Sequence, residues 1–237
     1  MSSVAIITAR GGSKRIPHKN IKNFLGKPII AYSIKAALES GCFEEVMVST
    51  DDKEIAEIAV SYGAKVPFFR SAENSDDFST TRDVVKEVLR QYGEQGKAFD
   101  YACCIYPTAP FITAERLAES MNLLEEKQAD SVFPVVQFSF PPQRSIVLDE
   151  GRAAFKWPEY ALARSQDLEP FYHDCGQFYC INVKAFEEQE LLVMKNTYPV
   201  VLDEMEVQDI DNETDWKLAE LKYRLIGEMK KDDRNSC

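Results

Sequence analysis

The chain has 237 residues, with 39 acidic and 28 basic side chains and a net charge of −11. This length suits one large domain, or one domain with an elaboration, and it buries enough surface to fold without disulfides or a metal. The negative charge argues against nucleic acid or an anionic membrane as the main partner. The apolar run at residues 4–9 is too short for a signal-peptide core or a membrane span.

The hydrophobic pattern alternates between short apolar runs and segments with helical spacing. Strands are predicted at residues 4–9, 46–50, 101–106, 131–136, 177–182 and 198–202. Helices are predicted at residues 28–40, 55–62, 84–92, 114–124 and 216–229. This alternation predicts an α/β fold with a mostly parallel sheet flanked by helices, whose ligands bind beyond the carboxyl ends of the strands.

Local signals mark several helix boundaries. Pro28 occupies the expected first position of the first helix, and Gly41 ends it. Asp51 and Glu54 resemble a capping box before the second helix. Thr113 is the expected cap of the fourth helix.

The pattern changes after Phe138, where residues 140–170 are rich in proline, arginine and aromatic residues and have poor periodicity. We interpret residues 138–182 as a small inserted lobe, within a single domain that spans residues 1–229. The charged residues 230–237 are expected to form a flexible tail.

Six cysteines are spread along the chain, and none forms a Cys-x-x-Cys pair. They are Cys42, Cys103, Cys104, Cys175, Cys180 and Cys237. Their spacing matches neither a zinc site nor a disulfide framework, so we interpret them as reduced thiols and expect a cytoplasmic protein. Adjacent Cys103 and Cys104 should point to opposite faces of a strand.

The turn after the first strand, residues 9–20, contains two glycines and then a concentration of positive charge. Arg10, Lys14, Arg15 and Lys19 fall within ten positions of an acidic protein. Glycine lets backbone N–H groups approach phosphate oxygens, and the basic side chains neutralise their charge. The pattern favours a polyphosphate site, although it is neither a P-loop nor a dinucleotide fingerprint. The alternative is a surface turn with solvated charges.

Asp209 and Asp211 alternate within residues 208–211, which places both carboxylates on one side of an extended segment. Mg²⁺ accepts one or two carboxylates together with substrate phosphates. The alternative is a helix entry at which Asp211 or Asn212 caps the following helix.

Two more motifs end predicted strands. Residues 106–110, Tyr-Pro-Thr-Ala-Pro, form a rigid loop where α/β proteins keep their ligands, although an ordinary strand exit is the simpler interpretation. Residues 49–52, Ser-Thr-Asp-Asp, end another strand, and Asp51 is interpreted there as a helix cap.

The segment from residue 143 to residue 177 combines aromatic, basic and amide side chains. A sugar acid needs guanidinium groups for its carboxylate and amides for its hydroxyl and acyl groups. The candidate residues are Gln143, Arg144, Arg164, Gln166 and Gln177. A lobe interface or a dimer contact is the alternative, and both interpretations can hold for one segment.

Together, residues 9–20, 49–52, 106–110 and 208–211 resemble the cytidylyltransferases that activate nonulosonic acids, the family of CMP-sialic acid synthetase. The motifs occur in the family's order and at about its spacings, and the resemblance runs from Val4 to about Leu225. It implies a Rossmann-like nucleotide-diphospho-sugar transferase fold. It also implies transfer of CMP from CTP to a sugar acid with release of pyrophosphate, and Mg²⁺ as the cofactor.

The matching positions imply roles for individual residues. Lys19, Arg10 and Asp211 would be catalytic, and Asp209 and Asp211 would hold the metal. The implied nucleotide-binding residues are Arg10, Gly11, Gly12, Ser13, Lys19, Asn20, Arg70 and Thr80, the last standing for one hydroxyl of the Ser79-Thr80-Thr81 cluster. Family members commonly form homodimers in which the inserted lobe reaches the neighbouring subunit's site.

Within the family, residues 103–111, 139–144, 157–160, 164–168 and 172–179 most resemble members that act on pseudaminic acid. Sialic acid synthetases carry Gln-Pro-Thr-Ser-Pro where this chain has Tyr106 to Pro110. The alternative is the same transfer to N-acetylneuraminic, legionaminic or another nonulosonic acid. A non-catalytic nucleotide-sugar binding module is a distant alternative. Such a module would be expected to have lost one or more of four charged residues, and all four are present: Arg10, Lys19, Asp209 and Asp211.

Overall fold

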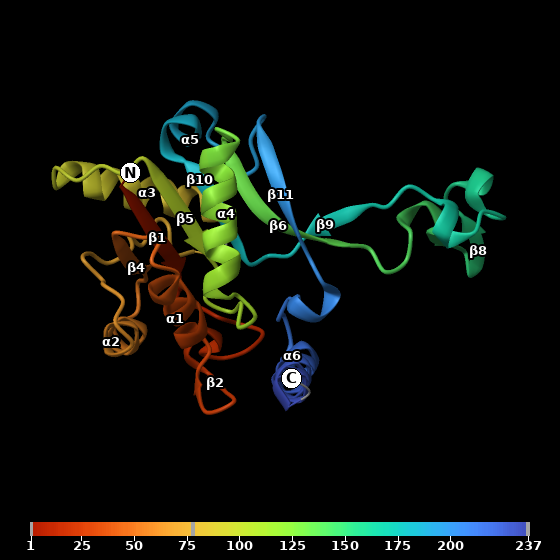
Figure 1. Ribbon diagram of the computed structural model, residues 1–237, viewed down its shortest axis with the longest axis horizontal. Coiled ribbons are helices and arrows are strands. Elements are labelled where there is room, and N and C mark those ends of the chain that lie inside the picture. The colour runs from red at the N-terminus through yellow and green to blue at the C-terminus, as the bar shows by residue number, and fades with distance from the viewer. Residues whose placement is uncertain (1, 77–78, 236–237) are drawn as a thin grey trace.

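The computed structural model describes residues 2–76 and 79–235, and over these residues the chain forms a seven-stranded sheet with helices on both faces (Figure 1). The strand order is β11-β6-β10-β5-β1-β4, and β9 pairs with β6. The strands are β1 (Ser3–Thr8), β4 (Glu45–Ser49), β5 (Tyr101–Ile105), β6 (Ser131–Gln137), β9 (Tyr172–Asp174), β10 (Phe178–Asn182) and β11 (Thr197–Leu202). The predicted α/β class is confirmed.

The sheet is mixed in strand direction. Strand β1 runs parallel to both β4 and β5, and β11 runs parallel to β6. Strand β10 lies between β5 and β6 and is antiparallel to both. The chain between β6 and β10 forms no α-helix, and parallel neighbours are usually joined by a crossover helix.

Helices cover both faces of the sheet through two apolar clusters. The helices are α1 (Ile30–Ser40), α2 (Lys53–Ser61), α3 (Thr81–Glu94), α4 (Ala114–Glu126), α5 (Val183–Gln189) and α6 (Glu213–Asn235). Helices α1, α2 and α4 contribute to the cluster that contains Cys103, whereas α3 and α5 contribute to the cluster that contains Cys104. The two adjacent cysteines therefore face opposite sides of β5, as predicted; Cys237 lies outside the described residues.

Several predicted boundaries are wrong by a few residues. Pro28 belongs to a two-residue hairpin, β2 (Asn23–Phe24) and β3 (Lys27–Pro28), and α1 begins at Ile30. Asp52, rather than Asp51, caps α2 by accepting hydrogen bonds from two backbone N–H groups. Thr113 caps α4 as predicted, and Gly41 ends α1 in the left-handed conformation.

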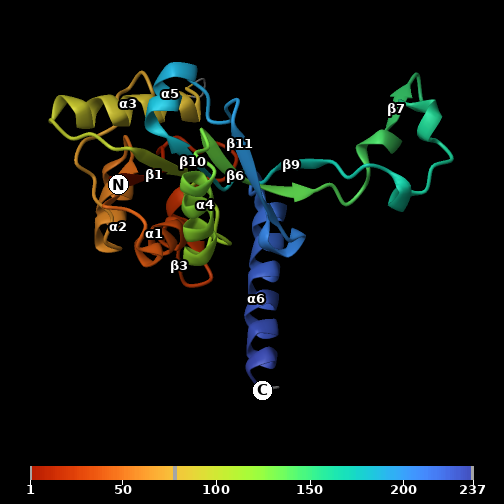
Figure 2. The same ribbon diagram turned by 45° about the horizontal axis from the view of Figure 1, so that its top comes forward.

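The last helix, α6, is longer than predicted and continues to Asn235 rather than ending at Met229. Its amino-terminal half packs Trp216 and Tyr223 edge-on against the ring of Phe24, with ring centroids 5.6 and 5.7 Å apart. These rings belong to a third apolar cluster, which also contains Ile16 and so packs α6 against the turn that follows β1. Figure 2 shows the helix extending away from the body of the protein. Among the described residues, no helix combines the length and the apolar character needed to cross a membrane.

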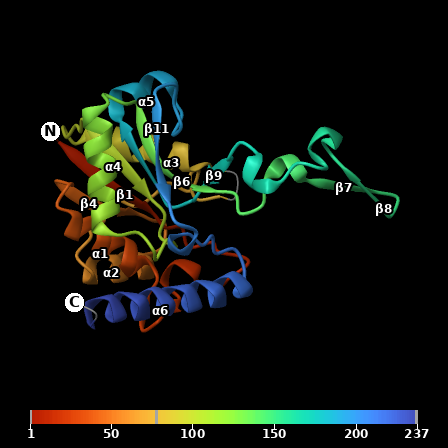
Figure 3. The ribbon, with the colours of Figure 1, turned by 45° about the vertical axis from the view of Figure 1, so that its right-hand side comes forward.

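Between β6 and β9 the chain leaves the sheet and forms an arm that reaches far from it (Figure 3). The arm contains a hairpin, β7 (Ile146–Asp149) and β8 (Arg152–Phe155), and the short 3₁₀ turns η2 (Pro142–Arg144), η3 (Pro158–Tyr160) and η4 (Ser165–Asp167). It exposes large apolar side chains, including Phe140 at 86% and Leu162 at 98% of their surface. The exposure of several large apolar side chains on one segment is typical of an interaction surface.

The buried carboxylate of Glu45, at the start of β4, is held by three donors. Tyr92 donates to it through its hydroxyl, and Lys65 and Lys97 each donate from 2.9 Å. Burial by itself would raise the pKa of Glu45, but these hydrogen bonds outweigh burial and lower the pKa to about 2. The cluster ties the edge strand to α3.

We predict that Glu45→Gln destabilises the protein at pH 7 by about 2–3 kcal/mol, the order of free energy that this pKa shift represents. Because the folded-state pKa is lowered, the stabilisation is present above the ordinary carboxyl pKa and is lost as the pH falls toward 2. Urea unfolding from pH 7 to pH 3 should therefore show the wild type and the variant converging below about pH 4.5. A gap that stays constant with pH would contradict this account.

Candidate active site

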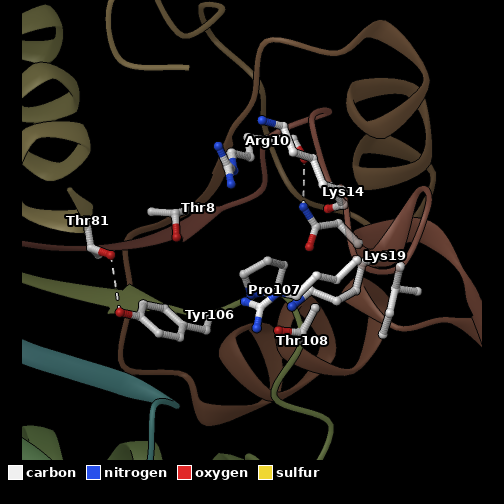
Figure 4. Close-up of a pocket in the computed structure, with 12 residues that line it drawn as sticks. Thr8, Arg10, Lys14, Lys19, Thr81, Tyr106, Pro107 and Thr108 are labelled. Carbon is white, nitrogen blue, oxygen red and sulfur yellow. Dashed lines mark hydrogen bonds between the residues drawn. The ribbon is translucent and has the colours of Figure 1, made fainter. Parts of the chain in front are cut away.

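A cavity of about 670 Å³ lies beyond the carboxyl ends of β1 and β5 (Figure 4). Thr8 ends β1, and Tyr106 directly follows β5. The lining residues are Thr8, Arg10, Ser13, Lys14, Arg15, Ile16, Lys19, Asn20, Thr81, Tyr106, Pro107 and Thr108. This is the edge of the sheet at which the strand pattern predicts a ligand site.

The turn after β1 is shaped by its own polar contacts. Buried Asn20 donates from its side chain to the carbonyl of Arg10 at 2.8 Å. The N–H of Gly11 donates to the carboxylate of Asp51 at 2.9 Å, which explains why Asp51 does not cap α2. These contacts fix a turn that keeps the positive side chains on the cavity side.

All four basic residues of the turn line this cavity. Figure 4 shows Lys14 and Lys19 across the cavity from Thr81 and Tyr106. Burial lowers the pKa of Lys19, although Asp211 and Asp209 raise it in part. The Lys19 ammonium donates to the carbonyl of Ile210 at 2.7 Å, so the turn is bonded to the acidic segment near the other end of the chain. A cavity with this charge suits an anion of several charges.

The acidic segment 209–211 borders this cavity. Ile210 is buried, whereas Asp209 and Asp211 on either side of it are accessible. Asp211 forms an ion pair with Arg15 at 2.7 Å. Asn212 caps α6 by accepting hydrogen bonds from two N–H groups of its first turn, so Asp211 is not the helix cap.

These carboxylates fit a hard divalent cation, which prefers oxygen ligands. Ion pairing with Arg15 shows that Asp211 already receives a cation at this position. Within residues 2–76 and 79–235, no group of three or more His, Cys, Asp or Glu side chains gathers at one point. A metal at Asp209 and Asp211 would therefore take its remaining ligands from substrate and water.

A second cavity, of about 510 Å³, adjoins the first. Tyr106 lines both cavities, and its hydroxyl lies 3.2 Å from the hydroxyl of Thr81. On the second cavity's wall, Asp174 accepts hydrogen bonds from the Tyr179 hydroxyl and from the backbone N–H of Gly176. The ring of Tyr106 thus lies between a basic cavity and a second cavity whose wall carries carboxylates.

The second cavity contains one lysine, Lys222, whose ammonium donates to the backbone carbonyls of Glu204 and Val207 at 3.1 and 2.8 Å. Its carboxylates are Asp174, Glu204 and Asp209. The second cavity therefore favours ligand groups that donate hydrogen bonds, such as hydroxyl and amide N–H groups, over a ligand carboxylate.

Some sequence-predicted nucleotide residues lie beside the first cavity rather than in its lining. Arg70 is buried and donates to the side chain and the carbonyl of Ser49 at 3.1 and 2.6 Å. Burial lowers the pKa of Arg70, while Asp51 raises it. The carbonyl of Ser49 also accepts the N–H of Ala9, so Arg70 supports the start of the turn from below.

Of the three hydroxyl residues at positions 79–81, Thr81 is the one that lines the first cavity. Thr80 instead caps α3 in a capping box with Asp83. Gly11 and Gly12 shape the turn without lining the cavity, whereas Ser13 does line it.

The predicted sugar-binding residues divide between the arm and the sheet. Gln143, Arg144, Arg164 and Gln166 lie on the arm and line neither of the two cavities. Gln177 is buried beside the second cavity and donates to the carbonyl of Glu206 at 2.7 Å. Within one chain, the structure does not bring the arm residues to the basic turn.

Three other residues of this region fall in segments that the sequence analysis selected, 143–177 and 208–211, but were given no role of their own there. His173, Asp174 and Gln208 line the second cavity, and they come from β9 and from the segment before α6. The sequence places Asp174 in the sugar-binding segment, but its position on the wall of the second cavity depends on the pairing of β9 with β6.

Comparison with known proteins agrees with this geometry. Residues 4–212 match the family model described as Cytidylyltransferase. The chain is 40% identical over 226 residues to "Pseudaminic acid cytidylyltransferase" of Campylobacter jejuni, covering 95% of this chain and 97% of that protein. It is 36% identical to "CMP-N,N'-diacetyllegionaminic acid synthase" of Legionella pneumophila, again covering 95% and 97% of the two chains.

Among solved structures, the fold resembles that of CMP:2-keto-3-deoxy-manno-octonic acid synthetase complexed with CTP, with a TM-score of 0.68. The match covers 96% of this chain and 100% of that one, at 17% sequence identity. At this identity the likeness concerns the fold alone.

We predict different costs for alanine at the two glycines of the turn. A Cβ on Gly11 would stand 2.8 Å from a carboxylate oxygen of Asp52 and 3.1 Å from its Cβ, whereas a Cβ on Gly12 would meet nothing within 4 Å. Because Asp52 caps α2, displacing it should cost about 1 kcal/mol. Urea unfolding should show that loss for Gly11→Ala and a change within about 0.5 kcal/mol for Gly12→Ala. Equal losses in the two variants would contradict the described contact.

Proposed function

Because the chain belongs to the cytidylyltransferase family, we propose that it transfers CMP from CTP to a nonulosonic acid, releasing pyrophosphate. The preferred acceptor is pseudaminic acid. The observation that carries this proposal is the basic cavity beyond β1 and β5, formed by the matched family segment in an otherwise acidic chain. A Mg²⁺-dependent reaction in the cytoplasm is part of the proposal.

The basic cavity would hold the nucleotide. Arg10 and Lys19 bind the triphosphate, and Gly11, Gly12, Ser13 and Asn20 shape the turn around it. Thr81, rather than Thr80, offers a hydroxyl to the nucleotide, since it lines the cavity. Arg70 positions the turn through Ser49.

The reaction needs positioning and charge neutralisation more than covalent chemistry by the protein. The anomeric hydroxyl of the sugar acid attacks the α-phosphorus in line with the departing pyrophosphate. Lys19 and Arg10 stabilise the charge that develops on the phosphates. Asp209 and Asp211 would hold Mg²⁺, which when bound neutralises charge on the α-phosphate and on the leaving group. Asp211 also assists removal of the hydroxyl proton.

The second cavity would hold the sugar acid, because it shares Tyr106 with the nucleotide cavity and contains Asp209. Its carboxylates suit the hydroxyl and amide N–H groups of a sugar, but they leave the sugar's own carboxylate without a cationic partner. The missing guanidinium groups are carried by Arg144 and Arg164, which do not line this cavity and belong to the arm that extends away from the sheet in Figure 3.

We therefore propose a homodimer in which the arm of one subunit completes the sugar site of the other. The apolar surface of the arm would be buried in that contact. In this arrangement the arm, residues 138–171, acts as the sugar-binding and dimerisation lobe, with Gln143 and Gln166 on the same arm as the two arginines. Residues 172–182 of the predicted lobe instead contribute β9 and β10 to the central sheet. Gln177 supports the sugar site from behind, because its side chain is bonded to the backbone of Glu206.

Transfer to N-acetylneuraminic or legionaminic acid is the main alternative, since the 36% identity to the legionaminic acid synthase also lies within the family. It predicts turnover of that acid at a rate equal to or above that with pseudaminic acid. A binding module without catalysis is the distant alternative, and it predicts CTP binding without pyrophosphate release.

We predict that Lys19→Ala lowers turnover about a hundredfold, because one charged donor to the transition state is removed. Lys22→Ala is the matched control. Lys22 follows the same 3₁₀ turn, η1 (Lys19–Ile21), but pairs with Glu213 at 2.6 Å outside the cavity. Pyrophosphate release with CTP and pseudaminic acid measures both variants. Near-full turnover of Lys19→Ala would overturn the assignment of the turn.

Subunit mixing tests the shared site. Lys19→Ala and Arg164→Ala should each be nearly inactive alone, since each removes one half of every site. A heterodimer of the two has one intact site, so random mixing should restore about a quarter of wild-type activity, as a two-fold symmetric dimer requires. Coexpression with two affinity tags isolates the mixed dimer. Absence of any recovery in the isolated mixed dimer would show that both residues act within one chain.

A further inference from the structure

Arg15 is the one basic residue of the turn, among the described contacts, whose guanidinium meets a carboxylate proposed to hold the metal. Its Nη2 lies 2.7 Å from Oδ1 of Asp211. Lys19 reaches the same segment but bonds to the backbone carbonyl of Ile210, so it occupies no carboxylate oxygen. Arg15 thus places its positive charge on a proposed ligand atom while its side chain also lines the nucleotide cavity.

The two partners of this ion pair differ in how firmly they are held. The backbone N–H groups of Asp211 and Asn212 both donate to Asp215, at 2.9 and 3.0 Å, which fixes the position of Asp211. The side chain of Arg15 is 68% exposed. Ion pairs at exposed sites contribute little free energy and are easily exchanged for another partner. Arg15 can therefore leave Asp211 without disturbing the fold.

We propose that Arg15 is an exchangeable counter-ion that occupies Asp211 in the substrate-free enzyme and moves to the nucleotide triphosphate when a divalent cation takes its place. This inference rests on the proposed function. It makes Arg15 a nucleotide-positioning residue of the same site, a role that the family motif does not assign to it. The exchange replaces the single charge of Arg15 beside Asp211 with the double charge of the metal ion and adds one guanidinium to the phosphates.

The exchange has an electrostatic reason in this protein. Asp209 and Asp211 carry like charges two residues apart, and the Lys19 ammonium is attracted to both but donates its hydrogen bond to the carbonyl of Ile210 rather than to either carboxylate. Arg15 relieves this repulsion until the metal arrives with CTP. Metal binding without nucleotide must displace Arg15 at no gain, whereas metal binding with nucleotide gives the released guanidinium a new anionic partner. Arg15 thereby couples the two binding events.

Removing Arg15 should consequently change the two affinities in opposite directions. With Arg15→Gln, the affinity of the empty enzyme for Mn²⁺ should rise about two- to fivefold, the range expected for loss of an exposed competing ion pair. The affinity for CTP in the presence of metal should fall about tenfold, because one charge-assisted contact to phosphate is lost. A residue that served only folding would lower both.

The test uses the full-length protein and two readouts other than turnover. Loss of the free Mn²⁺ signal in electron paramagnetic resonance measures metal uptake without nucleotide, and calorimetry measures CTP binding with and without metal. Lys22→Gln is the matched control, since it removes one positive charge just after the turn, where Lys22 pairs with Glu213, and leaves Asp211 paired. Asp211→Asn provides the background in which the gain in Mn²⁺ affinity should disappear. Thermal unfolding confirms that each variant is folded.

An unchanged Mn²⁺ affinity in Arg15→Gln would overturn the exchange, as would a gain that persists with Asp211→Asn or that Lys22→Gln reproduces. If neither the wild type nor Arg15→Gln takes up Mn²⁺ without nucleotide, while pyrophosphate release still needs a metal, the exchange is wrong and the proposed function stands. If CTP turnover fails in the wild type itself, the proposed function fails, independently of the Mn²⁺ result.

Discussion

The contact between the basic turn after β1 and the acidic segment before α6 is the constraint on which the rest of the site depends. The Lys19 ammonium joins the turn to residues 209–211 through the carbonyl of Ile210, across almost the whole length of the chain. The aromatic packing of Phe24 against α6 holds the turn next to the acidic segment. Attraction between their exposed charges would not be strong enough by itself, because water screens it. Opposite charges are thereby fixed at the sheet edge in a protein whose overall charge is strongly negative.

Two cavities with different chemical character lie beside this contact. One cavity is lined by the basic turn, and the other carries carboxylates and an already bonded lysine. Tyr106 lies between them and lines both cavities. Placing a polyanion on one side and a hydroxyl-rich acceptor on the other is what a transfer between phosphate and sugar requires. The anionic end of the acceptor is then the one group without a partner in the same chain, which is why the arm matters.

Much of this arrangement can be predicted from sequence because it depends on local signals. The apolar runs locate β1, β4, β5 and β6, and the glycines with clustered basic residues locate the polyphosphate cavity. The antiparallel placement of β10 could not be predicted, since a buried strand reads the same in either direction. Asp52 caps α2, whereas Asp51 accepts a hydrogen bond from the N–H of Gly11. The sequence could not predict these separate roles, because the contact with Gly11 joins residues that are far apart in the chain.

The acceptor side was less predictable for the same reason. Asp174 and His173 reach the second cavity only because β9 pairs with β6. The arm arginines were recognised from composition, but their distance from the cavity became visible only in three dimensions (Figure 3). Residue type alone indicates that Arg144 and Arg164 can bind a carboxylate. The position of the arm favours the sugar site of the partner subunit over the site in the same chain.

The most direct test of the account is pyrophosphate release with CTP and Mg²⁺, measured in parallel with pseudaminic acid and N-acetylneuraminic acid. The account predicts turnover with pseudaminic acid and little or none with N-acetylneuraminic acid. Preferential turnover of N-acetylneuraminic acid would contradict the acceptor assignment and leave the nucleotide cavity as described. No pyrophosphate from either acid would contradict the proposed reaction itself.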